Sequence, residues 1–302
     1  MAIITPALLT ALFTGYRAEY QRMYGETPTS WERIATLIPS TSKSNTYGWL
    51  GQFPKLAEWI GARVLKDMAA QGYTIANKLF EGTVSVPRTS IEDDEVGIYK
   101  PLFGEMGRAA KVFPDELTYG LLPLGLSTLC YDNQNFFDTD HPVYPNVDGT
   151  GAAKVVANLI DEAGGTPWYL LDTSRVIKPV IFQERTKPEL TTMTKADDEA
   201  VFMSDTYRYG VRYRCNAGFG FWQTALCSKK PLTTDNFNAA YDAMCAFTAD
   251  GGRPLGVKPS LLVVPTTLRT KANEVVTVSR LANGADNPNA GIVDVLVTPW
   301  LN

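Results

Sequence analysis

Residues 79–122 combine a strand pattern with a long helix pattern, and this segment constrains the fold more than any other part of the chain. Residues 83–86 predict a strand that stops at Pro87, and the carboxylates of residues 92–95 suit the positive end of a helix that begins near Asp94. Apolar residues then recur at helical spacing: Leu102, Met106, Ala109, Ala110 and Phe113. The pattern therefore predicts a long helix whose apolar stripe faces a sheet.

Proline residues predict where this helix changes direction and where it ends. Pro114 lies inside the helical pattern, where a proline removes one backbone hydrogen bond, so we expect a kink or a restart near Phe113. Pro123 and Gly125 are typical of a helix end, which places the last turn near Leu122.

Further strands and helices are intermixed along the chain. Alternating or continuous apolar runs predict strands within residues 168–184, 207–215, 260–265 and 292–297. Helical spacing predicts helices at residues 6–24 and 234–247 and after Thr267. Because these elements show no repeated βαβ order, the expected fold class is α+β.

The segments near the N-terminus carry apolar residues without a local core. Residues 25–48 are rich in Thr, Ser, Pro and Gly, which predicts an extended arm or, alternatively, an ordinary surface loop. Residues 49–88 predict a hairpin with arms near Glu58–Met68 and Lys78–Val86, an element that needs a partner surface. The apolar residues that depend on such a surface are Trp31, Ile34, Phe53, Trp59 and Ile60.

Composition restricts the class of partner. The chain has 302 residues with 45% hydrophobic and 20% charged, which suffices for a large core, and its net charge of −4 gives no general attraction to nucleic acid. The first 20 residues are apolar but lack a basic region, so neither a signal peptide nor a membrane span is expected. On the predicted strand 207–215, three arginines alternate with apolar residues: Arg208, Arg212 and Arg214. They could contact nucleic acid, although salt bridges within or between chains are the favoured interpretation.

Candidate metal ligands are scattered along the sequence. Four cysteines have no CxxC spacing, and we expect them to be buried free thiols: Cys130, Cys215, Cys227 and Cys245. The single histidine, His141, lies beside Asp138 and Asp140, where a metal or acid–base site is conceivable but a solvated loop is favoured. The acidic run at residues 92–95 is likewise interpreted as a solvated helix start rather than a cation site.

Catalytic motifs are equally sparse in this sequence. There is no G-x-S-x-G, no phosphate-binding loop, and a Ser-His-Asp triad would have to use His141. We therefore predict no catalytic, cofactor-binding or metal residues and no cofactor. The alternative that stays open is a soluble α+β enzyme or ligand-binding domain of unknown substrate, relying on carboxylates alone.

Several stretches in order resemble one family. Besides residues 79–122, they are DNQNFFDTDHPV at 132–143, YGVRYRCNAGFGFWQTALCS at 209–228, DGGRPLGVKPSLLVVPTTLRTKANEVV at 250–276 and NPNAGIVDVLVTPWL at 287–301. Together they resemble the major head protein of Mu-like bacteriophages, the gpT family, over nearly the whole chain. An ordered series of this kind is far more specific than any one of its pieces.

The resemblance implies the Hong Kong 97 capsid fold. On that basis residues 1–48 are expected to form an N-terminal arm and residues 49–93 a long hairpin called the E-loop. Residues 94–124, with the long spine helix, and residues 168–250 are expected to form the peripheral P-domain. Residues 125–167 and 251–302 are expected to form the axial A-domain.

The same resemblance implies a major capsid protein, not an enzyme, that self-assembles into the icosahedral head shell around the genome of a tailed Mu-like phage or prophage. The implied partners are other copies of the chain in hexamers and pentamers, a scaffold and a protease during assembly, a portal protein at one vertex and packaged double-stranded DNA on the inner face. No membrane is implied, and the chain would occupy the host cytoplasm before the virion. Subunit interfaces would then cover Trp31, Ile34, Phe53, Trp59 and Ile60.

Overall fold

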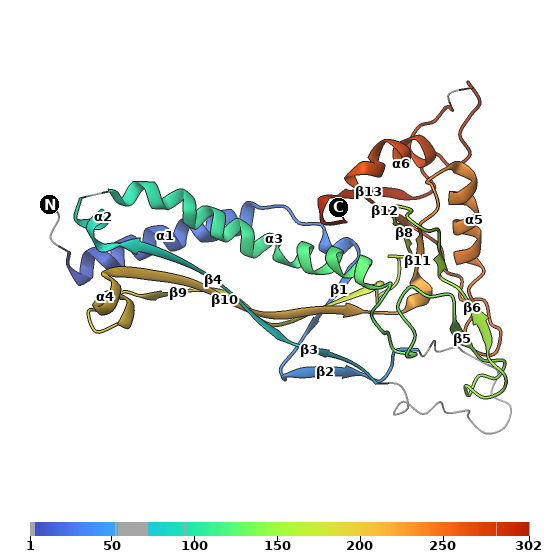
Figure 1. Ribbon diagram of the computed structural model, residues 1–302, viewed down its shortest axis with the longest axis horizontal. Coiled ribbons are helices and arrows are strands. Elements are labelled where there is room, and N and C mark those ends of the chain that lie inside the picture. Colours follow the sequence, from blue (N-terminus) through green and yellow to red (C-terminus); the bar gives the residue numbers. More distant parts are fainter. Residues whose placement is uncertain (1–3, 52, 54–71, 94, 282, 302) are drawn as a thin grey trace.

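Two lobes joined along one long helix make up the structure (Figure 1). This computed structural model describes residues 4–51, 53, 72–93, 95–281 and 283–301. In Figure 1 the first lobe extends to the left as two helices over a sheet of long strands, and the second lobe lies to the right around a shorter sheet. The observed mixture of segregated helices and mainly antiparallel strands confirms the predicted α+β class.

The first lobe is built on a four-stranded sheet in the order β1-β9-β10-β4. Its strands are β1 (Ala35–Pro39), β4 (Lys78–Pro87), β9 (Val180–Met193) and β10 (Thr206–Phe219). Strand β10 pairs antiparallel with both β4 and β9, whereas β1 runs parallel to β9. The alternation predicted for residues 207–215 is confirmed, because Tyr207, Tyr209, Val211, Tyr213 and Cys215 are all buried while Arg208 and Arg212 are exposed.

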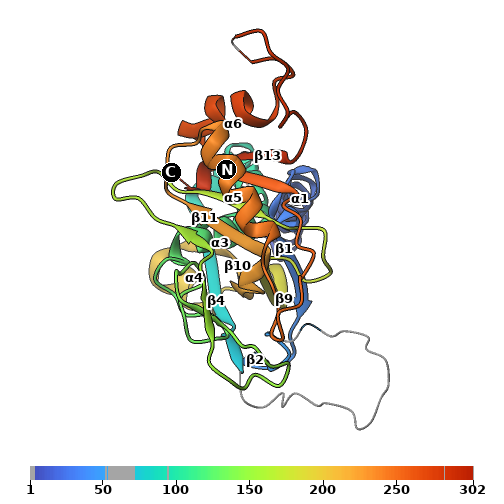
Figure 2. The same cartoon turned by 90° about the vertical axis from the view of Figure 1, so that its right-hand side faces the viewer.

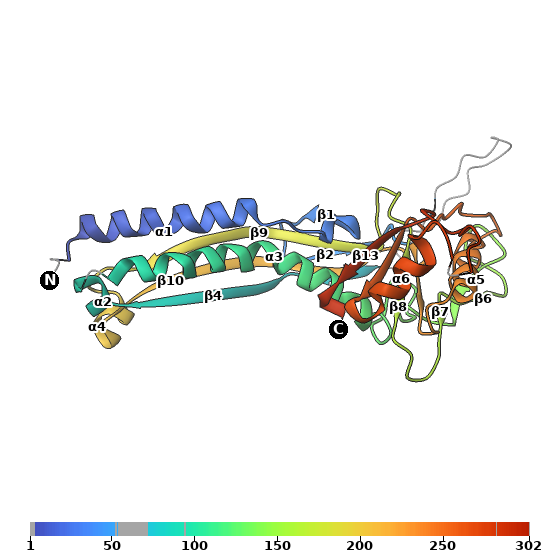
Figure 3. The ribbon, with the colours of Figure 1, turned by 90° about the horizontal axis from the view of Figure 1, so that it is seen from above.

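Helices α1 (Pro6–Glu26) and α3 (Lys100–Leu124) lie side by side on one face of this sheet (Figure 3). The Thr5 side chain caps α1 by accepting a hydrogen bond from the Leu8 backbone amide at 3.2 Å. Tyr16 of α1 stacks on Phe103 of α3 with ring centroids 4.1 Å apart, and both rings meet Tyr209 of β10 edge-on. Aromatic packing therefore joins the two helices to the sheet.

Helix α3 differs in two ways from the sequence-based prediction. Of the kink or restart expected near Phe113, the restart is wrong, because α3 continues as one helix through Pro114 and Pro123 to Leu124. Side chains on both sides of Pro114 are anchored, since Phe113 packs on Phe80 and the Asp115 carboxylate accepts the Ser30 and Trp31 amides. These tertiary contacts offset the missing hydrogen bond. None of the described helices is both long and apolar enough to cross a membrane.

The buried face of α3 is rotated around the helix axis relative to the predicted apolar stripe. Leu102 is 45% exposed and Ala109 is exposed, whereas Met106, Ala110 and Phe113 are half-buried. The buried face instead consists of Phe103, Gly104, Gly107, Pro114, Asp115, Thr118, Tyr119 and Leu122. A hydrophobicity pattern does not count glycine or aspartate as core residues, but here the Tyr20 backbone of α1 covers Gly107, and the Ser30 and Trp31 amides donate to Asp115.

The second lobe surrounds a five-stranded sheet in the order β13-β12-β8-β11-β7. Its strands are β7 (Leu159–Ile160), β8 (Trp168–Leu171), β11 (Ala225–Ser228), β12 (Leu261–Pro265) and β13 (Asp294–Thr298). Every residue of β8, β11 and β12 is buried, as expected for strands covered on both faces. Helix α5 (Thr234–Cys245) covers the outer face of the sheet, and α6 (Arg269–Val276) packs on β12 and β13 (Figure 2).

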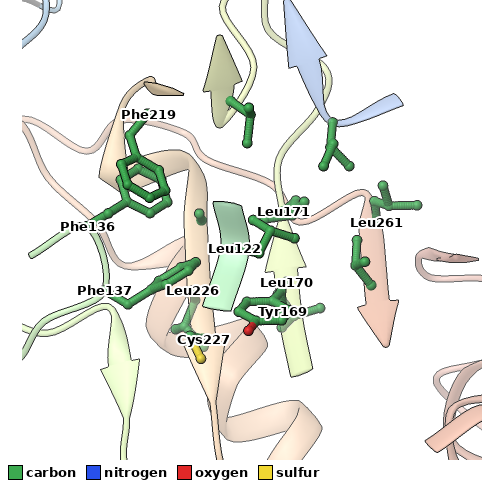
Figure 4. Close-up of a cluster of buried hydrophobic side chains, with 14 of the residues drawn as sticks. Leu122, Phe136, Phe137, Tyr169, Leu170, Leu171, Phe219, Leu226, Cys227 and Leu261 are labelled. Carbon is green, nitrogen blue, oxygen red and sulfur yellow. The ribbon is translucent and has the colours of Figure 1, made fainter. Parts of the chain in front are cut away.

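One hydrophobic core extends across the junction of the lobes. Phe136, from the loop after α3, stacks on Phe219 at the end of β10 with ring centroids 4.2 Å apart (Figure 4). Phe137 lies beside Tyr169 of β8, with ring centroids 5.4 Å apart. Residues after α3 and residues at the end of β10 thus hold the two sheets together.

Residues 25–48 are not an arm lacking its own core, as the sequence suggested. Trp31 lies in η1 (Trp31–Arg33) and packs on Phe182 of β9, and β1 follows at the edge of the first sheet. Trp31 and Ile34 are only 7% and 0% exposed. The apolar anchors of this segment therefore bury themselves in the subunit's own core, which periodicity alone could not show because their partners are about 150 residues away in sequence.

The predicted hairpin of residues 49–88 is only partly within the described residues. Its first arm, Glu58–Met68, lies outside them. Its second arm is confirmed as strand β4, which pairs with β10 rather than with a hairpin partner. A separate short ladder joins β2 (Ser44–Tyr47) to β3 (Tyr73–Ala76), at the two ends of the intervening segment.

The remaining described elements are short: α2 (Arg88–Glu92), η3 (Glu95–Tyr99), β5 (His141–Val143), β6 (Lys154–Val156), α4 (Glu199–Ser204), η4 (Trp222–Thr224), η5 (Thr266–Leu268) and η6 (Pro299–Leu301). The structure divides residues 168–250, which were expected to lie in one domain. Strands β9 and β10 belong to the first sheet with α3, whereas β8 and β11 belong to the second sheet with residues 251–302. Residues 168–250 therefore belong to two lobes, because strands that are consecutive in the chain pair in different sheets.

Candidate functional site

An open apolar groove lies where the second lobe meets residues 49–53. It has a volume of about 510 Å³ and is lined by Trp49, Phe53, Ser174, Arg175, Val176, Ile177 and Phe221. The Phe53 ring lies 4.6 Å from Phe221, and Val176 is 88% exposed. Apolar surface of this kind marks a site of protein interaction more often than an ordinary exposed face does.

Among the residues predicted to need a partner surface, Phe53 lies in this groove. Trp31 and Ile34 do not, because both are buried in the core of the subunit itself and leave almost no area for a partner. Trp59 and Ile60 lie outside the described residues. The groove residues Trp49 and Val176 were missed, although Trp49 belongs to the same glycine-flanked segment as Phe53.

A second exposed apolar pair lies at the far end of the first lobe. Phe202 and Met203 of α4 are 80% and 73% exposed, while Ala200 and Val201 of the same helix are buried. Figure 1 shows α4 at the end of the β9–β10 pair, away from the second lobe. Strand β9 precedes this helix and ends at Met193.

Strand β10 presents its arginines on the sheet face that the helices leave open. Arg208 and Arg212 are exposed and Arg214 is half-buried, and their cross-strand neighbours on β4 are Ser85, Glu81 and Leu79. Within the described part of the chain none of the three arginines forms an ion pair, so the favoured intra-chain salt bridges are not present there.

A buried polar cluster surrounds the single histidine. His141 at the start of β5 is 0% exposed and stacks on Trp222 with ring centroids 4.1 Å apart. Its Nδ1 lies 2.7 Å from Asp132 Oδ2, and its Nε2 lies 3.1 Å from Asn158 Oδ1. The prediction of a solvated loop was therefore wrong, because the chain between α3 and β5 folds inward over Trp222 and the adjacent carboxylates, Asp138 and Asp140, do not contact the ring.

The orientation of the Asn158 amide determines the protonation of the His141 ring. Asn158 Nδ2 donates to the backbone carbonyls of Phe136, Trp222 and Ala225 at 2.8, 3.4 and 3.3 Å, so Oδ1 must face His141. Oδ1 can only accept, and His141 Nε2 therefore carries a hydrogen. The other ring nitrogen is held against the Asp132 carboxylate.

Three groups contact the Asp132 carboxylate. Its Oδ1 accepts hydrogen bonds from the Cys130 thiol at 3.0 Å and the Gln134 backbone amide at 3.1 Å, and its Oδ2 faces His141. Burial raises the pKa of the Asp132 carboxyl, but the hydrogen bonds and the charge of His141 outweigh it and hold the pKa below its ordinary value. The Asp132 carboxyl is thus held in its ionised form, with Oδ2 beside His141 Nδ1.

Three kinds of metal ligand meet in this cluster. Cys130, Asp132 and His141 each contribute one possible ligand atom, and these three atoms lie within 4.8 Å of one another. A small cavity of about 30 Å³ borders Asp132 and is also lined by Tyr131, Gln223 and Asp250. Sequence spacing identified His141 as the one possible partner of the cysteines but gave no reason to pair it with Cys130.

The expected burial of the cysteines is confirmed at three positions and wrong at the fourth. Cys130, Cys215 and Cys227 are buried, and burial raises the pKa of each thiol. Cys245 is exposed at the end of α5. All four are free thiols.

Comparison with known proteins identifies relatives over the whole chain. Residues 9–301 match the family described as Mu-like prophage major head subunit gpT. The chain is 47% identical over 304 residues to the major capsid protein of Escherichia phage Mu, covering 99% of this chain and 100% of the relative. It is also 47% identical over 280 residues to the Mu-like prophage FluMu major head subunit of Haemophilus influenzae, covering 91% of each chain.

Solved structures show the same architecture. The procapsid of bacteriophage JBD30 contains a chain that matches with a TM-score of 0.87 and 64% identity, covering 98% of this chain and 100% of that one. The JBD30 capsid matches with a TM-score of 0.77 and 48% identity, covering 100% of both chains. A further JBD30 capsid, decorated with minor capsid protein trimers, matches with a TM-score of 0.77 and 47% identity over 100% of both chains.

Proposed function

Since the chain belongs to the Mu-like gpT family of major head subunits and is a major capsid protein with the Hong Kong 97-type fold, we propose that it builds the icosahedral head shell around the genome of a tailed Mu-like phage or prophage. The observation that carries this proposal is the match of the whole chain, at high identity, to subunits of the JBD30 shell. The chain acts in this role as a structural subunit and not as an enzyme.

On this proposal each lobe corresponds to one domain of the capsid fold. Helix α3 is the spine helix, and with α1 and the four-stranded sheet it forms the peripheral P-domain. The five-stranded sheet with α5 and α6 forms the axial A-domain, so residues 168–171 and 225–245 move from the P-domain to the A-domain. The E-loop, expected at residues 49–93, has Phe53 at the apolar groove and includes strand β4.

Two apolar surfaces support contacts between copies. The groove with Trp49, Phe53 and Val176 can accept apolar side chains from a neighbouring subunit, and Phe202 and Met203 present such side chains on α4, at the end of the first lobe away from the second. A subunit with two separate exposed apolar surfaces suits a closed shell, in which each copy meets several neighbours. Trp59 and Ile60 remain predicted interface residues on the E-loop.

Further partners follow from the role of a head subunit. We expect hexamers and pentamers of the chain, a scaffold and a protease during assembly in the host cytoplasm, a portal protein at one vertex and double-stranded DNA on the inner face. The decoration of the related JBD30 capsid by minor capsid protein trimers supports an outer surface that binds such proteins. The open arginine face of β10 offers positive charge to an acidic partner.

We also propose that the subunit conformation described here is the one found in the procapsid, before the shell matures. Support comes from the closer overlay on the JBD30 procapsid, with a TM-score of 0.87, than on the JBD30 capsid, with a TM-score of 0.77. A change in the relative placement of segments would then accompany maturation of the shell.

Electron microscopy tests the proposed function directly. The chain is expressed alone and, in parallel, together with the other head proteins of its phage, and the products are separated by size. We expect shells, tubes or capsomers in at least one of the two preparations. A folded monomer in both, at concentrations where related head proteins assemble, would support the alternative of a soluble α+β enzyme or ligand-binding domain.

A further inference from the structure

The buried cluster between α3 and β5 contains a thiol, a carboxylate and an imidazole that point toward one another. We propose that Cys130, Asp132 and His141 bind one Zn²⁺ ion through Sγ, Oδ2 and Nδ1. Their ligand atoms lie within 4.8 Å of one another although the residues span 12 positions of sequence. A thiolate, a carboxylate and an imidazole together suit Zn²⁺, which takes nitrogen, sulfur and oxygen ligands in tetrahedral geometry.

The surroundings of His141 prepare its Nδ1 for a metal. In zinc sites the second ring nitrogen donates its hydrogen to a carbonyl or carboxylate, which fixes the tautomer and the ring orientation. Asn158 Oδ1 accepts from Nε2 at 3.1 Å, and the Asn158 amide is itself held by the Phe136, Trp222 and Ala225 carbonyls. Trp222 stacks on the ring and prevents it from tilting. Nδ1 is therefore directed at Asp132.

The distances allow the ion to enter with a small movement. In tetrahedral geometry, metal–ligand bonds of about 2.0–2.2 Å place nitrogen and oxygen ligands about 3.3 Å apart. His141 Nδ1 and Asp132 Oδ2 are 2.7 Å apart, and Asp132 rather than the stacked His141 ring can move outward, because Asp132 borders the cavity of about 30 Å³. A cavity of that size holds one water molecule, which would complete the coordination.

Binding of the metal would displace hydrogens from its ligands. In the structure Cys130 donates its thiol hydrogen to Asp132 Oδ1, and His141 Nδ1 lies 2.7 Å from Asp132 Oδ2. Zn²⁺ binds a thiolate and an unprotonated ring nitrogen, so any hydrogen on Cys130 Sγ or His141 Nδ1 would leave to solvent. One thiolate and one carboxylate balance the charge of the ion, so the occupied site would be neutral.

Cobalt is the probe for this site, because Co²⁺ occupies tetrahedral zinc sites and absorbs visible light. Titration of the purified full-length chain with Co²⁺ should give tetrahedral ligand-field bands and a thiolate charge-transfer band that saturate at one equivalent and disappear when Zn²⁺ is added. Cys130→Ser and His141→Gln should lose the charge-transfer band. Cys245→Ser removes the exposed thiol and should keep it, which controls for binding at a surface cysteine.

Thermal unfolding of the wild-type chain gives a second measurement that needs no buried variant. Zn²⁺ should raise the Tm of the wild type and of Cys245→Ser, because a ligand that binds only the folded chain stabilises it. A chelator should reverse the shift. Unchanged Tm and the absence of a cobalt thiolate band in a folded wild-type chain would overturn the proposal, and would leave His141 and Asp132 as a structural ion pair. The assembly experiment above is independent of either result.

Discussion

Single residues decide how closely the helices of the first lobe approach. Gly107 of α3 has no side chain, and a Cβ atom placed there would lie 2.3 Å from the Tyr20 backbone oxygen of α1. Gly120 of the same helix has no neighbouring atom within 4 Å of such a Cβ. The same residue type thus has a packing role at one position and none at the other.

Gly107→Ala and Gly120→Ala should change stability in opposite directions. Alanine raises helix stability by about 1 kcal/mol over glycine, and at Gly120 this gain should appear. At Gly107 the clash with Tyr20 should exceed the gain and cost about 1–3 kcal/mol overall. Urea unfolding of the two unassembled variants measures both effects. Equal stability of the variants would show that α1 does not pack on α3 in this way.

Ionisation of Tyr119 should lower the free energy of unfolding at alkaline pH. Burial raises the pKa of its hydroxyl from 10.0 to about 12, so its contribution is fully present below pH 10 and is lost as the pH rises toward 12. The wild type should therefore lose on the order of 1–3 kcal/mol more than Tyr119→Phe across this interval. Unfolding free energies at neutral pH and between pH 10 and pH 12 measure the difference. Parallel pH profiles of the two proteins would contradict it.

At the scale of the element, α3 shows that a helix can be predicted correctly while its buried face is not. The sequence predicted the existence and approximate length of the helix, but the predicted stripe included the exposed Leu102 and omitted the buried Phe103. One residue is a rotation of about 100° around a helix, which is enough to exchange a core position for a surface position.

Phe103→Ala and Leu102→Ala test the observed phase of α3. Phe103 is 0% exposed and stacks on Tyr16, so its truncation should cost about 3–5 kcal/mol. Leu102 is 45% exposed, and its truncation should cost less than about 1 kcal/mol. Thermal unfolding of the unassembled subunits separates the two cases. A larger loss of stability in Leu102→Ala than in Phe103→Ala would instead support the buried face expected from the sequence.

At the scale of the whole molecule, the division into lobes brings together segments that are far apart in sequence. The first sheet joins residues 35–39 and 78–87 to residues 180–219, and the second joins residues 159–171 to 225–228 and 261–298. The chain therefore crosses between the lobes several times, and the core continues through the junction. Trp49, Phe53 and Phe221 extend this core to the wall of the groove, whereas Phe202 and Met203 of α4 lie outside it and are largely exposed.

The double variant Phe202→Ser/Met203→Ser should reduce assembly without unfolding the subunit. Both side chains are largely exposed, so the free energy of unfolding should change by no more than about 0.5 kcal/mol. Shell yield, measured by sedimentation and electron microscopy, should fall because apolar contact area between copies is lost. Val155→Ser, which alters an exposed apolar residue of the other lobe, is the control and should assemble normally. Normal shells from the double variant would remove α4 from the proposed interfaces.

Shells of this chain should be held together without covalent bonds between subunits. Lys66 and Lys78 lie on the predicted E-loop hairpin, but a lysine alone gives no indication of a cross-link, and Lys78 is an exposed residue of β4. Mature heads should therefore run on a denaturing gel as one band near 33.2 kDa. A ladder of larger species that survives heat and reducing agent would show cross-linking instead.

The sequence by itself determined the α+β class, the alternation of β10, the buried strands of the second lobe and the long helix, although α3 begins at Lys100 and not near Asp94. Each depends on a repeat of 2.0 or 3.6 residues, or on a continuous apolar run, and such patterns are local. The ordered motifs also determined the family, since they extend over nearly the whole chain. For the candidate interface, the sequence indicated Phe53, which lines the apolar groove.

Tertiary structure alone decided which residues meet. Trp31 and Ile34 have their partners on β9, Gly107 has its neighbour on α1, and the burial of His141 depends on Trp222 and Asn158. These contacts join segments that lie tens of residues apart or more, and no local period records them. The residues Cys130, Asp132 and His141 are closer in sequence, but an irregular loop and a short strand bring their ligand atoms together, and no local period records that contact either.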